Sequence, residues 1–289
     1  MRVDRTRRAL LISTCALAFD ASAAAPVIER ASFKTSDSVR LSYLHAHRPG
    51  ARPIVFVPGW CLPADIWQVQ LEALAPTHAV YALDPRGQGE SDVPTTGYTA
   101  DRRAADLHEF LQRLAQPAVI VAWSLAGLES LQLVHRFGTR RVAALALVDS
   151  SVGEGPATRG NGVSAFEQRL REDRAAALRE FVTAVFRNPP PEAEIARLAA
   201  AMQRMPLAAS LDLLAYAQPR EHWRSVARAL RKPLLYAHTP QYARQARLLK
   251  HARPATVLVP FDESGHALFA DAPDRFNREL TRFVNAAPG

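Results

Sequence analysis

Ser124 stands where a β-branched apolar run, Val119–Val121, gives way to small residues that open a helical pattern. A serine hydroxyl held on a tight strand-to-helix turn is a candidate nucleophile, and such a turn requires small residues two positions before and two after it. Here these residues are Ala122 and Ala126, with Gly127 next. The usual spelling has glycine at both flanking positions, and a serine at the end of a strand is also a common helix cap. Residues 122–127 alone are compatible with both a nucleophile and a helix cap.

The elements that must position this serine follow a regular alternation of short apolar strands and amphipathic helices. Strands are predicted at Val27–Lys34, Val39–His45, Ile54–Val57, Ala79–Leu83, Val119–Ala122, Ala143–Val148, Pro233–Ala237 and Thr256–Val259. The first two form a hairpin pattern, and the later ones are near-continuous Val/Ile/Leu runs, typical of a parallel sheet covered on both faces. The alternation predicts an α/β fold with an open, mostly parallel eight-stranded sheet flanked by helices.

One interval, from about residue 152 to about residue 231, contains no convincing strand. It holds two helical segments, Phe166–Phe186 and Glu192–Met205, which prolines 189–191 separate. A connection of this length is far longer than an ordinary loop. Because it leaves and re-enters at the carboxyl edge of the sheet, where ligands bind in such folds, we expect a helical cap over that edge. The alternative is a helical domain that plays no part in the site.

Three further stretches of the chain carry motifs. "VFVPGWCLPADIW" (Val55–Trp67) is a strand followed by a loop, "LDPRGQGESD" (Leu83–Asp92) is an Asp-x-Arg-Gly-x-Gly-x-Ser turn, and "ESGHALFADAPDRFN" (Glu263–Asn277) places a Gly-His pair ahead of the final helix. Together with the Ser124 turn, they occur in the order typical of the α/β-hydrolase family, which the chain resembles over roughly residues 27–289. Within that family it is most similar to the cap-bearing serine esterase and cofactor-free haloperoxidase-like branch. Pro58 departs from the pattern, since histidine usually precedes this glycine.

The resemblance implies a role for each of these residues. Ser124 is expected to be the nucleophile and His266 the base that accepts its proton. The backbone N–H groups of Trp60 and Leu125 are expected to stabilise the negative charge that builds on the substrate carbonyl oxygen. The side chains of Trp60 and Trp123 are expected to bind substrate as walls of an apolar acyl pocket, although tryptophans at these places are equally compatible with the core.

The acid that orients the histidine is where the sequence departs from the family. Members usually carry it in the loop after the seventh strand, but here that loop, Tyr236–Ala246, contains no Asp or Glu. Asp149 ends the sixth predicted strand, where some members place their acid, and it preserves the chain order of serine, acid and histidine. Asp262 lies four residues before His266, a closeness that more often gives a local loop contact. We favour Asp149, whose alternative role is to cap the turn that follows it.

Other polar residues point to structure rather than to a second chemistry. In the resembling family, turn residues such as Asp84, Arg86 and Ser91 brace loops, and we expect the same here. No His/Cys/Asp cluster has the spacing of a metal site, and residues 87–89 lack the third glycine of a phosphate-binding loop. We therefore expect no metal and no cofactor. No stripe of clustered basic residues is present, so we expect no nucleic-acid partner.

The first 25 residues read as an export signal. Four arginines precede an apolar run from Ala9 to Phe19, and small residues 21–25 follow. A run of eleven residues is too short to span a bilayer, which needs about 20. The order matches a secretory signal with cleavage within Ala23–Ala25, and residues 6–11 resemble a twin-arginine export motif. We expect a periplasmic or secreted protein, residues 26–289, with no stable membrane insertion after the signal is removed.

Removal of the signal would take away four arginines and two aspartates, so the formal net charge would fall from +8 to +6. It would also remove Cys15 and leave Cys61 as the one cysteine, which excludes an internal disulfide. The sequence thus predicts an exported serine hydrolase that cleaves a small-molecule carboxylic ester through an acyl-serine intermediate. A lactonase, a perhydrolase and a small-molecule binding module with slow turnover remain alternatives, and the oligomeric state stays open.

Overall fold

A computed structural model describes residues 27–156, 162–215 and 218–287. The predicted export signal at residues 1–25 lies outside them. The strands are β1 (Glu29–Lys34), β2 (Arg40–Ala46), β3 (Pro53–Val57), β4 (Ala79–Leu83), β5 (Ala118–Trp123), β6 (Val142–Val148), β7 (Leu234–His238) and β8 (Val257–Pro260). All eight lie within two residues of the predicted bounds. They form one sheet in the order β1-β2-β4-β3-β5-β6-β7-β8, antiparallel at β1–β2 and β2–β4 and parallel elsewhere.

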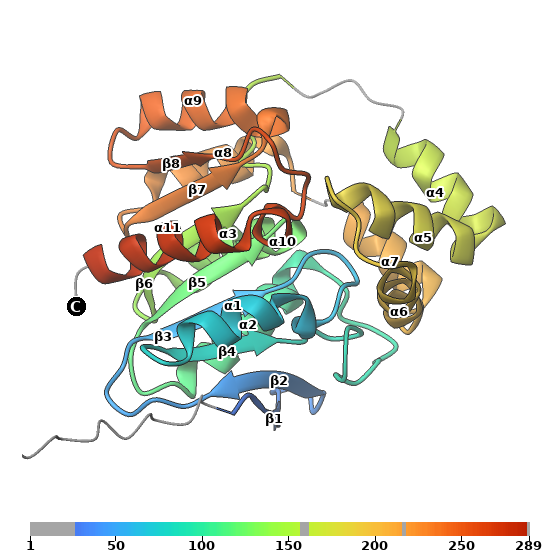
Figure 1. Ribbon diagram of the computed structural model, residues 1–289, viewed down its shortest axis with the longest axis horizontal. Helices are drawn as coiled ribbons and strands as arrows, with labels where there is room; N and C mark the ends of the chain where they lie inside the picture. The colour runs from blue at the N-terminus through green and yellow to red at the C-terminus, as the bar shows by residue number, and fades with distance from the viewer. Residues whose placement is uncertain (1–26, 157–161, 216–217, 288–289) are drawn as a thin grey trace, which may run out of the picture.

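Helices cover both faces of this sheet (Figure 1). They are α1 (Gln68–Leu74), α2 (Ala100–Gln112), α3 (Leu125–Phe137), α4 (Gly162–Glu172), α5 (Arg174–Val185), α6 (Glu192–Gln203), α7 (Leu207–Leu214), α8 (Arg220–Ala229), α9 (Ala243–Ala252), α10 (Leu268–Asp271) and α11 (Pro273–Ala286). The apolar faces of α1 and α11 join one core cluster, and those of α2, α3, α8 and α9 join the other. The predicted α/β sheet flanked by helices is confirmed.

The central strands are buried on both sides, which explains their unbroken apolar sequences. In β3, Ile54 and Phe56 enter the core cluster beneath α1, while Val55 and Val57 enter the cluster beneath α2 and α3. Successive side chains of a strand point to opposite faces, so a strand covered on both faces has no polar alternation. The strand β5 lies between β3 and β6, which places Ser124 near the middle of the carboxyl edge.

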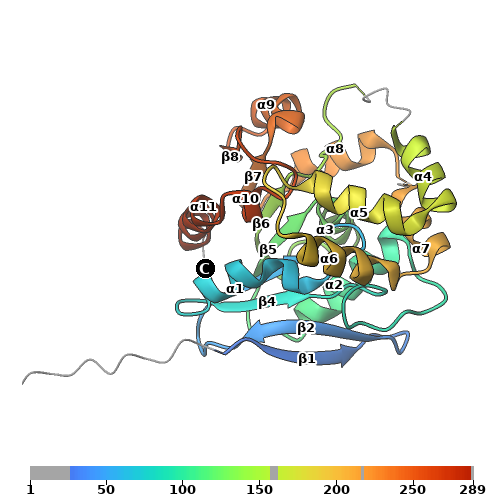
Figure 2. The same cartoon turned by 45° about the vertical axis from the view of Figure 1, so that its right-hand side comes forward.

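The helical insertion between β6 and β7 divides into two parts. Helices α4 to α7 lie beyond the carboxyl edge as a cap (Figures 1 and 2). Helix α8 instead packs against α3, and its Trp223 and Val226 enter the same core cluster as α3. The predicted cap boundary at about 231 is therefore too late, since amphipathic helices of the cap and of the sheet layer look alike in sequence. The predicted segment 166–186 is also broken, because Asp173 caps α5 by accepting the N–H of Ala176 at 3.0 Å.

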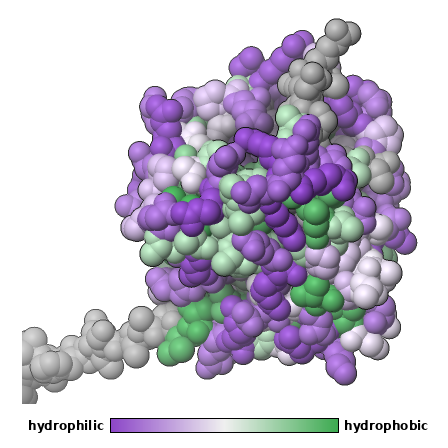
Figure 3. Space-filling model, turned by 90° about the vertical axis from the view of Figure 1, so that its right-hand side faces the viewer, coloured by the Kyte–Doolittle hydropathy of each residue, from purple (hydrophilic) through white to green (hydrophobic). Residues whose placement is uncertain are grey.

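The surface that the cap presents is mostly hydrophilic, with small, separate apolar patches (Figure 3). Large exposed apolar side chains are scattered along the described chain and belong to Val27, Val69, Val93 and Val257. No helix of the described residues has the length and apolar content needed to cross a membrane.

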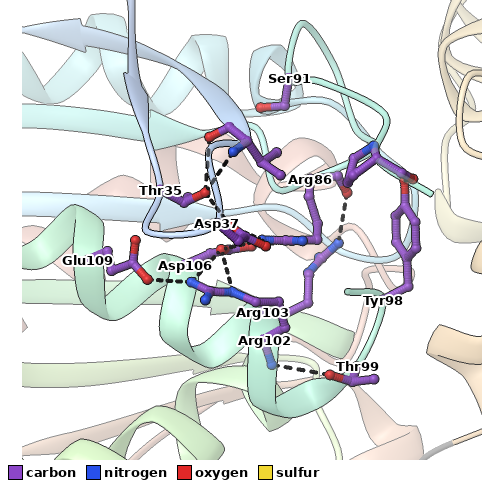
Figure 4. Close-up of polar contacts among 12 residues, drawn as sticks. Thr35, Asp37, Arg86, Ser91, Tyr98, Thr99, Arg102, Arg103, Asp106 and Glu109 are labelled. Carbon is purple, nitrogen blue, oxygen red and sulfur yellow. Dashed lines mark hydrogen bonds and ion pairs between the residues drawn. The ribbon is translucent and has the colours of Figure 1, made fainter. Parts of the chain in front are cut away.

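The turn after β4 is braced as its motif predicts. Ser91 Oγ donates to the carbonyl of Asp84 at 2.5 Å and accepts the N–H of Ser42 at 2.8 Å. Arg86 reaches α2 and forms a two-pronged ion pair with Asp106, at 2.6 and 2.8 Å, while also contacting Asp37 at 3.0 Å (Figure 4). The Arg86 side chain is 1% exposed, and its attraction to these carboxylates outweighs burial and raises its pKa. The turn is thereby held to β2 and α2.

Replacing Arg86 should therefore destabilise the fold strongly. Arg86→Met removes the donor to the buried Asp106 Oδ2, although Arg102 still contacts Oδ1, and removing one partner of a buried ion pair typically costs about 3 kcal/mol or more. Arg179→Met is a matched control, because its exposed pair with Glu192 is worth at most about 1 kcal/mol. Urea denaturation of both variants measures the difference, and equal unfolding midpoints would contradict this account of the turn.

Candidate active site

Ser124 sits on a sharp bend between β5 and α3. Its backbone has φ of 56° and ψ of −121°, a left-handed conformation that is strained for any residue other than glycine. The bend leaves no room for larger neighbours: a Cβ on Gly59 would lie 3.2 Å from the Ser124 Cβ, and a Cβ on Gly127 would lie 2.2 Å from Ser150 Oγ. The Ser124 side chain makes no helix-capping hydrogen bond. The hydroxyl therefore does not cap α3, and the cap interpretation is wrong.

The structure brings Ser124, His266 and Asp149 together. The Nε2 atom of His266 lies 2.8 Å from Ser124 Oγ, and its Nδ1 atom lies 2.8 Å from Asp149 Oδ2. The Asp149 carboxylate is fully buried, whereas the imidazole is 21% exposed and Ser124 is also partly accessible. A carboxylate on the Nδ1 side favours the tautomer that carries its proton there, which leaves Nε2 free to accept the serine proton.

Both oxygens of Asp149 are used. While Oδ2 faces the imidazole, Oδ1 accepts the N–H of Thr239 at 2.7 Å, and the Asp149 N–H donates to the carbonyl of Ala237 at 2.8 Å. The loop after β7 that lacks an acid thus supplies a backbone donor instead. Asp262, the alternative acid, is exposed in the loop after β8. Of the two candidates, the geometry favours Asp149.

The His266 loop is held by one hydrogen bond from the core and one to the cap. Trp123 Nε1 donates to the His266 carbonyl at 2.9 Å, and the two rings lie 5.3 Å apart. The N–H of Ala267 donates at 2.7 Å to the carbonyl of Val185, the last residue of α5. Trp123 is 1% exposed, so the structure assigns it to the support of His266 and not to the predicted pocket wall. The sequence could not distinguish a pocket wall from a support for His266, because a tryptophan next to Ser124 is compatible with either role.

The Asp271 carboxylate joins the histidine loop to the linker between α5 and α6. It accepts the N–H of Gly265 at 2.8 Å, that of Arg187 at 2.9 Å and that of Asn188 at 3.0 Å. Gly265 permits this approach, since a Cβ there would lie 2.6 Å from the Arg187 nitrogen. The glycine of the Gly-His motif is thus required by contact with the cap.

The loop after β3 carries Trp60 close to Ser124 and into the cap. Trp60 Nε1 donates to the carbonyl of Ser210 at 2.7 Å, and its ring makes edge-on contacts with Phe166 and Phe181. Trp60 is 3% exposed, so it acts mainly as a link between this loop and helices α4, α5 and α7. Its predicted contact with substrate is limited to that small exposed edge.

A cavity of about 490 Å³ has Leu125, the residue after Ser124, in its wall, while Ser124 and His266 themselves do not line it. Loop residues 95–100, α3, α7 and α8 enclose it, and its walls include Leu128, Leu213 and Trp223 with Glu129 as a polar side chain. The lining is mainly apolar. Among the residues that the structure describes, no group of three or more His, Cys, Asp or Glu side chains is arranged to hold a metal ion.

Sequence analysis missed three polar residues around this site: Gln88, Arg103 and Glu129. All three are buried, and together they connect the loop after β3 with α3. Gln88 was considered only as part of a phosphate loop. The only signal in the sequence was that Gln88 is a polar residue inside the turn 83–92, whose other polar residues brace loops. That signal is too weak to identify a role.

A sequence profile of the α/β hydrolase family matches residues 54–279. The chain belongs to the α/β-hydrolase family. The match spans the Ser124 bend, the Asp84 turn and the His266 loop, so the family resemblance inferred from these motifs is confirmed. The predicted similarity to esterases and haloperoxidases is confirmed by the relatives that follow.

This hydrolase-family chain is similar to proteins of two named activities. It is 27% identical to a pimeloyl-[acyl-carrier protein] methyl ester esterase of Vibrio vulnificus, over 83% of this chain and 98% of that protein. It is 36% identical to the non-heme chloroperoxidase CPO-A1 of Kitasatospora aureofaciens, but only over 40% of this chain and 42% of that one. A bromoperoxidase from Bacillus anthracis shares the fold, with a TM-score of 0.80, 22% identity and coverage of 89% and 100%.

Cys61 lies in the same loop as Trp60, but it is not a second nucleophile. The thiol is 1% exposed, and burial raises its pKa well above the ordinary range. Only a thiolate reacts readily with alkylating agents. Iodoacetamide at pH 8 should therefore leave Cys61 unmodified in the folded protein and modify it after denaturation. Peptide mass mapping checks this, and rapid labelling of the native protein would contradict the buried position.

Proposed function

We propose that this α/β hydrolase cleaves a carboxylic ester through an acyl-Ser124 intermediate. The observation that carries the proposal is the unbroken pair of 2.8 Å contacts from Ser124 through His266 to Asp149. In the first step, Ser124 Oγ attacks the ester carbonyl and His266 Nε2 accepts its proton. Asp149 stabilises the imidazolium that forms without becoming protonated itself. His266 then returns the proton to the departing alcohol.

Two backbone N–H groups are proposed to stabilise the oxyanion of the tetrahedral intermediate. The N–H of Leu125 is the first of α3, and the first N–H groups of a helix have no intrahelical acceptor. The N–H of Trp60 follows Gly59, which packs directly against Ser124. Each such donor is worth about 3 kcal/mol of transition-state stabilisation.

In the second half of the reaction, water replaces the alcohol. His266 removes a proton from water, which attacks the acyl carbonyl, and Ser124 Oγ leaves with the proton that His266 returns to it. The products are the acid and the regenerated serine. The mainly apolar cavity beside Leu125 suits an uncharged, largely hydrocarbon part of a small-molecule ester.

A second candidate is perhydrolysis, in which hydrogen peroxide takes the place of water at the acyl-enzyme and a peracid leaves. The similarity to the non-heme chloroperoxidase supports it, because the same residues would serve both acceptors. The full-length similarity to an ester hydrolase favours water. A lactone is an internal ester and would be opened by the same steps. A binding module with slow turnover would keep this geometry and show little product.

Site variants test the mechanism directly. Purified protein is assayed on short-chain and long-chain p-nitrophenyl esters with Ser124→Ala, Asp149→Asn and Asp262→Asn. Ser124→Ala should abolish turnover, and Asp149→Asn should lower kcat up to ~10⁴-fold because the imidazole takes the wrong tautomer. Asp262→Asn, the matched control, should stay within about twofold because its carboxylate is exposed.

The outcomes separate the candidates. Wild-type turnover no higher than that of Ser124→Ala would refute catalysis and leave the binding module. A severe Asp262→Asn defect with a mild Asp149→Asn defect would reverse the acid assignment. Peracid formed from acetate and peroxide, at a rate above ester hydrolysis, would favour the perhydrolase.

We further propose that the protein is exported by residues 1–25 and acts in the periplasm or outside the cell. The order of basic, apolar and small residues supports this. After expression in a Gram-negative host, N-terminal sequencing of the periplasmic fraction should begin near residue 24. A cytoplasmic protein that retains Met1 would refute export, and fusing residues 1–25 to a reporter provides the control.

A further inference from the structure

Gln88 holds the loop that carries Trp60. Its side chain is fully buried in the turn after β4, and its Nε2 donates to the carbonyls of Gly59 at 3.0 Å and Leu62 at 2.6 Å. These two carbonyls bracket Trp60 and Cys61. The Gln88 amide therefore binds both ends of the segment 59–62, which supplies a proposed oxyanion donor, the Trp60 N–H.

The Gly59 contact fixes the direction of the Trp60 N–H. The Gly59 carbonyl and the Trp60 N–H belong to one planar peptide unit, and in a trans peptide they point in opposite directions. Anchoring the oxygen on Gln88 therefore aims the N–H away from Gln88. A hydrogen bond to the carbonyl also polarises the unit and strengthens the N–H as a donor.

Side chains of the segment pack into the core and the cap, but its backbone has few hydrogen bonds besides those to Gln88. Cys61 has φ of 58°, in the strained left-handed region, and the turn is closed by a hydrogen bond of 3.3 Å from the Leu62 N–H to the Gly59 carbonyl. Pro58 and Pro63 flank the segment and have no N–H to donate.

The orientation of Gln88 is itself set by a buried ion pair. Arg103, on α2, donates from NH1 to Gln88 Oε1 at 2.8 Å, which leaves Nε2 to face the two carbonyls. Arg103 Nε lies 3.0 Å from an oxygen of Glu129, and both side chains are nearly inaccessible. Glu129 belongs to α3, five residues after Ser124, so the chain of contacts ends on the helix that begins with the Leu125 donor.

We infer that Gln88, oriented by Arg103 and Glu129, is a positioning residue that sets the Trp60 N–H relative to the Leu125 N–H. This inference rests on the proposed function, because the two donors matter only if an oxyanion forms between them. Two donors on separate elements stabilise that charge only at hydrogen-bond distance from one point. The buried chain from Gln88 to α3 keeps both elements in register.

The test uses Gln88→Met, which keeps side-chain length but removes the donor. With a p-nitrophenyl ester, kcat should fall about 10- to 100-fold while KM changes less than about threefold, because the interaction acts in the transition state. The inhibition constant of a trifluoromethyl ketone, which forms a tetrahedral oxyanion on serine, should rise by the same factor as kcat/KM falls.

Gln132→Met is the matched control. Gln132 is also a buried glutamine with two hydrogen bonds, to Asp101 at 2.6 Å and to His222 at 2.7 Å, but it lies toward the far end of α3. It should lose comparable stability and keep kcat within about twofold. An equal loss in both variants, a Gln88→Met effect confined to KM, or an unchanged ketone inhibition constant would each overturn the inference.

A readout without turnover separates this inference from the proposed function. Hydrogen–deuterium exchange of the peptide covering residues 58–64 should be faster in Gln88→Met than in the wild type and unchanged in Gln132→Met. If the wild type hydrolyses no ester, the proposed function fails, and the exchange still shows whether Gln88 holds the loop. Equal exchange in Gln88→Met and wild type would overturn the positioning role.

Discussion

The left-handed backbone of Ser124 is the constraint on which the rest of the site depends. A residue with a side chain costs about 1–3 kcal/mol in such a conformation, so the surrounding structure must enforce it. It does so from two sides: the Ser124 N–H donates to the carbonyl of Val148, and the Ser124 carbonyl accepts the N–H of Gly127. This backbone conformation turns the Ser124 side chain away from the sheet, and α3 begins at the next residue, Leu125. The bend also brings Gly59 against Ser124 and the first turn of α3 against Ser150, which leaves no room for a side chain at Gly59 or Gly127.

Asp149 is under two similar constraints, one on its backbone conformation and one on its buried carboxylate. Asp149 also has positive φ, at 42°, and its carboxylate is fully buried beside His266. Burial of an isolated carboxylate is unfavourable, but here each oxygen has a donor: the imidazole on one side and the Thr239 N–H on the other. The backbone of the β7 loop can serve this purpose because the β6–β7 ladder holds it in register. A carboxylate at the end of β6 can therefore reach the imidazole although the β7 loop carries none.

The sheet was predictable because its physics is local. A short β-branched apolar run such as Val119–Val121 is typical of a strand that is covered on both faces of a parallel sheet. The motifs that follow such runs indicate where the strands end. Ser124 was predictable because it follows β5 directly, and His266 because it belongs to the Gly-His motif ahead of the final helix. The cap limit and the roles of Gln88 and Trp123 depend on contacts between residues far apart in the chain. Trp123, for example, meets His266 across more than a hundred positions, and the sequence does not record which face of a tryptophan is covered.

The cap is part of the site and not a separate lid. The Asp271 carboxylate binds N–H groups on both sides, from Gly265 beside the base and from Arg187 and Asn188 in the cap. The bond from the Ala267 N–H to Val185 joins the same two regions, and the Trp60 ring lies between cap residues and the loop of a proposed oxyanion donor. A swing of the whole cap would break these contacts and displace His266 and Trp60 together. The position of α5 and the geometry of the site are therefore coupled.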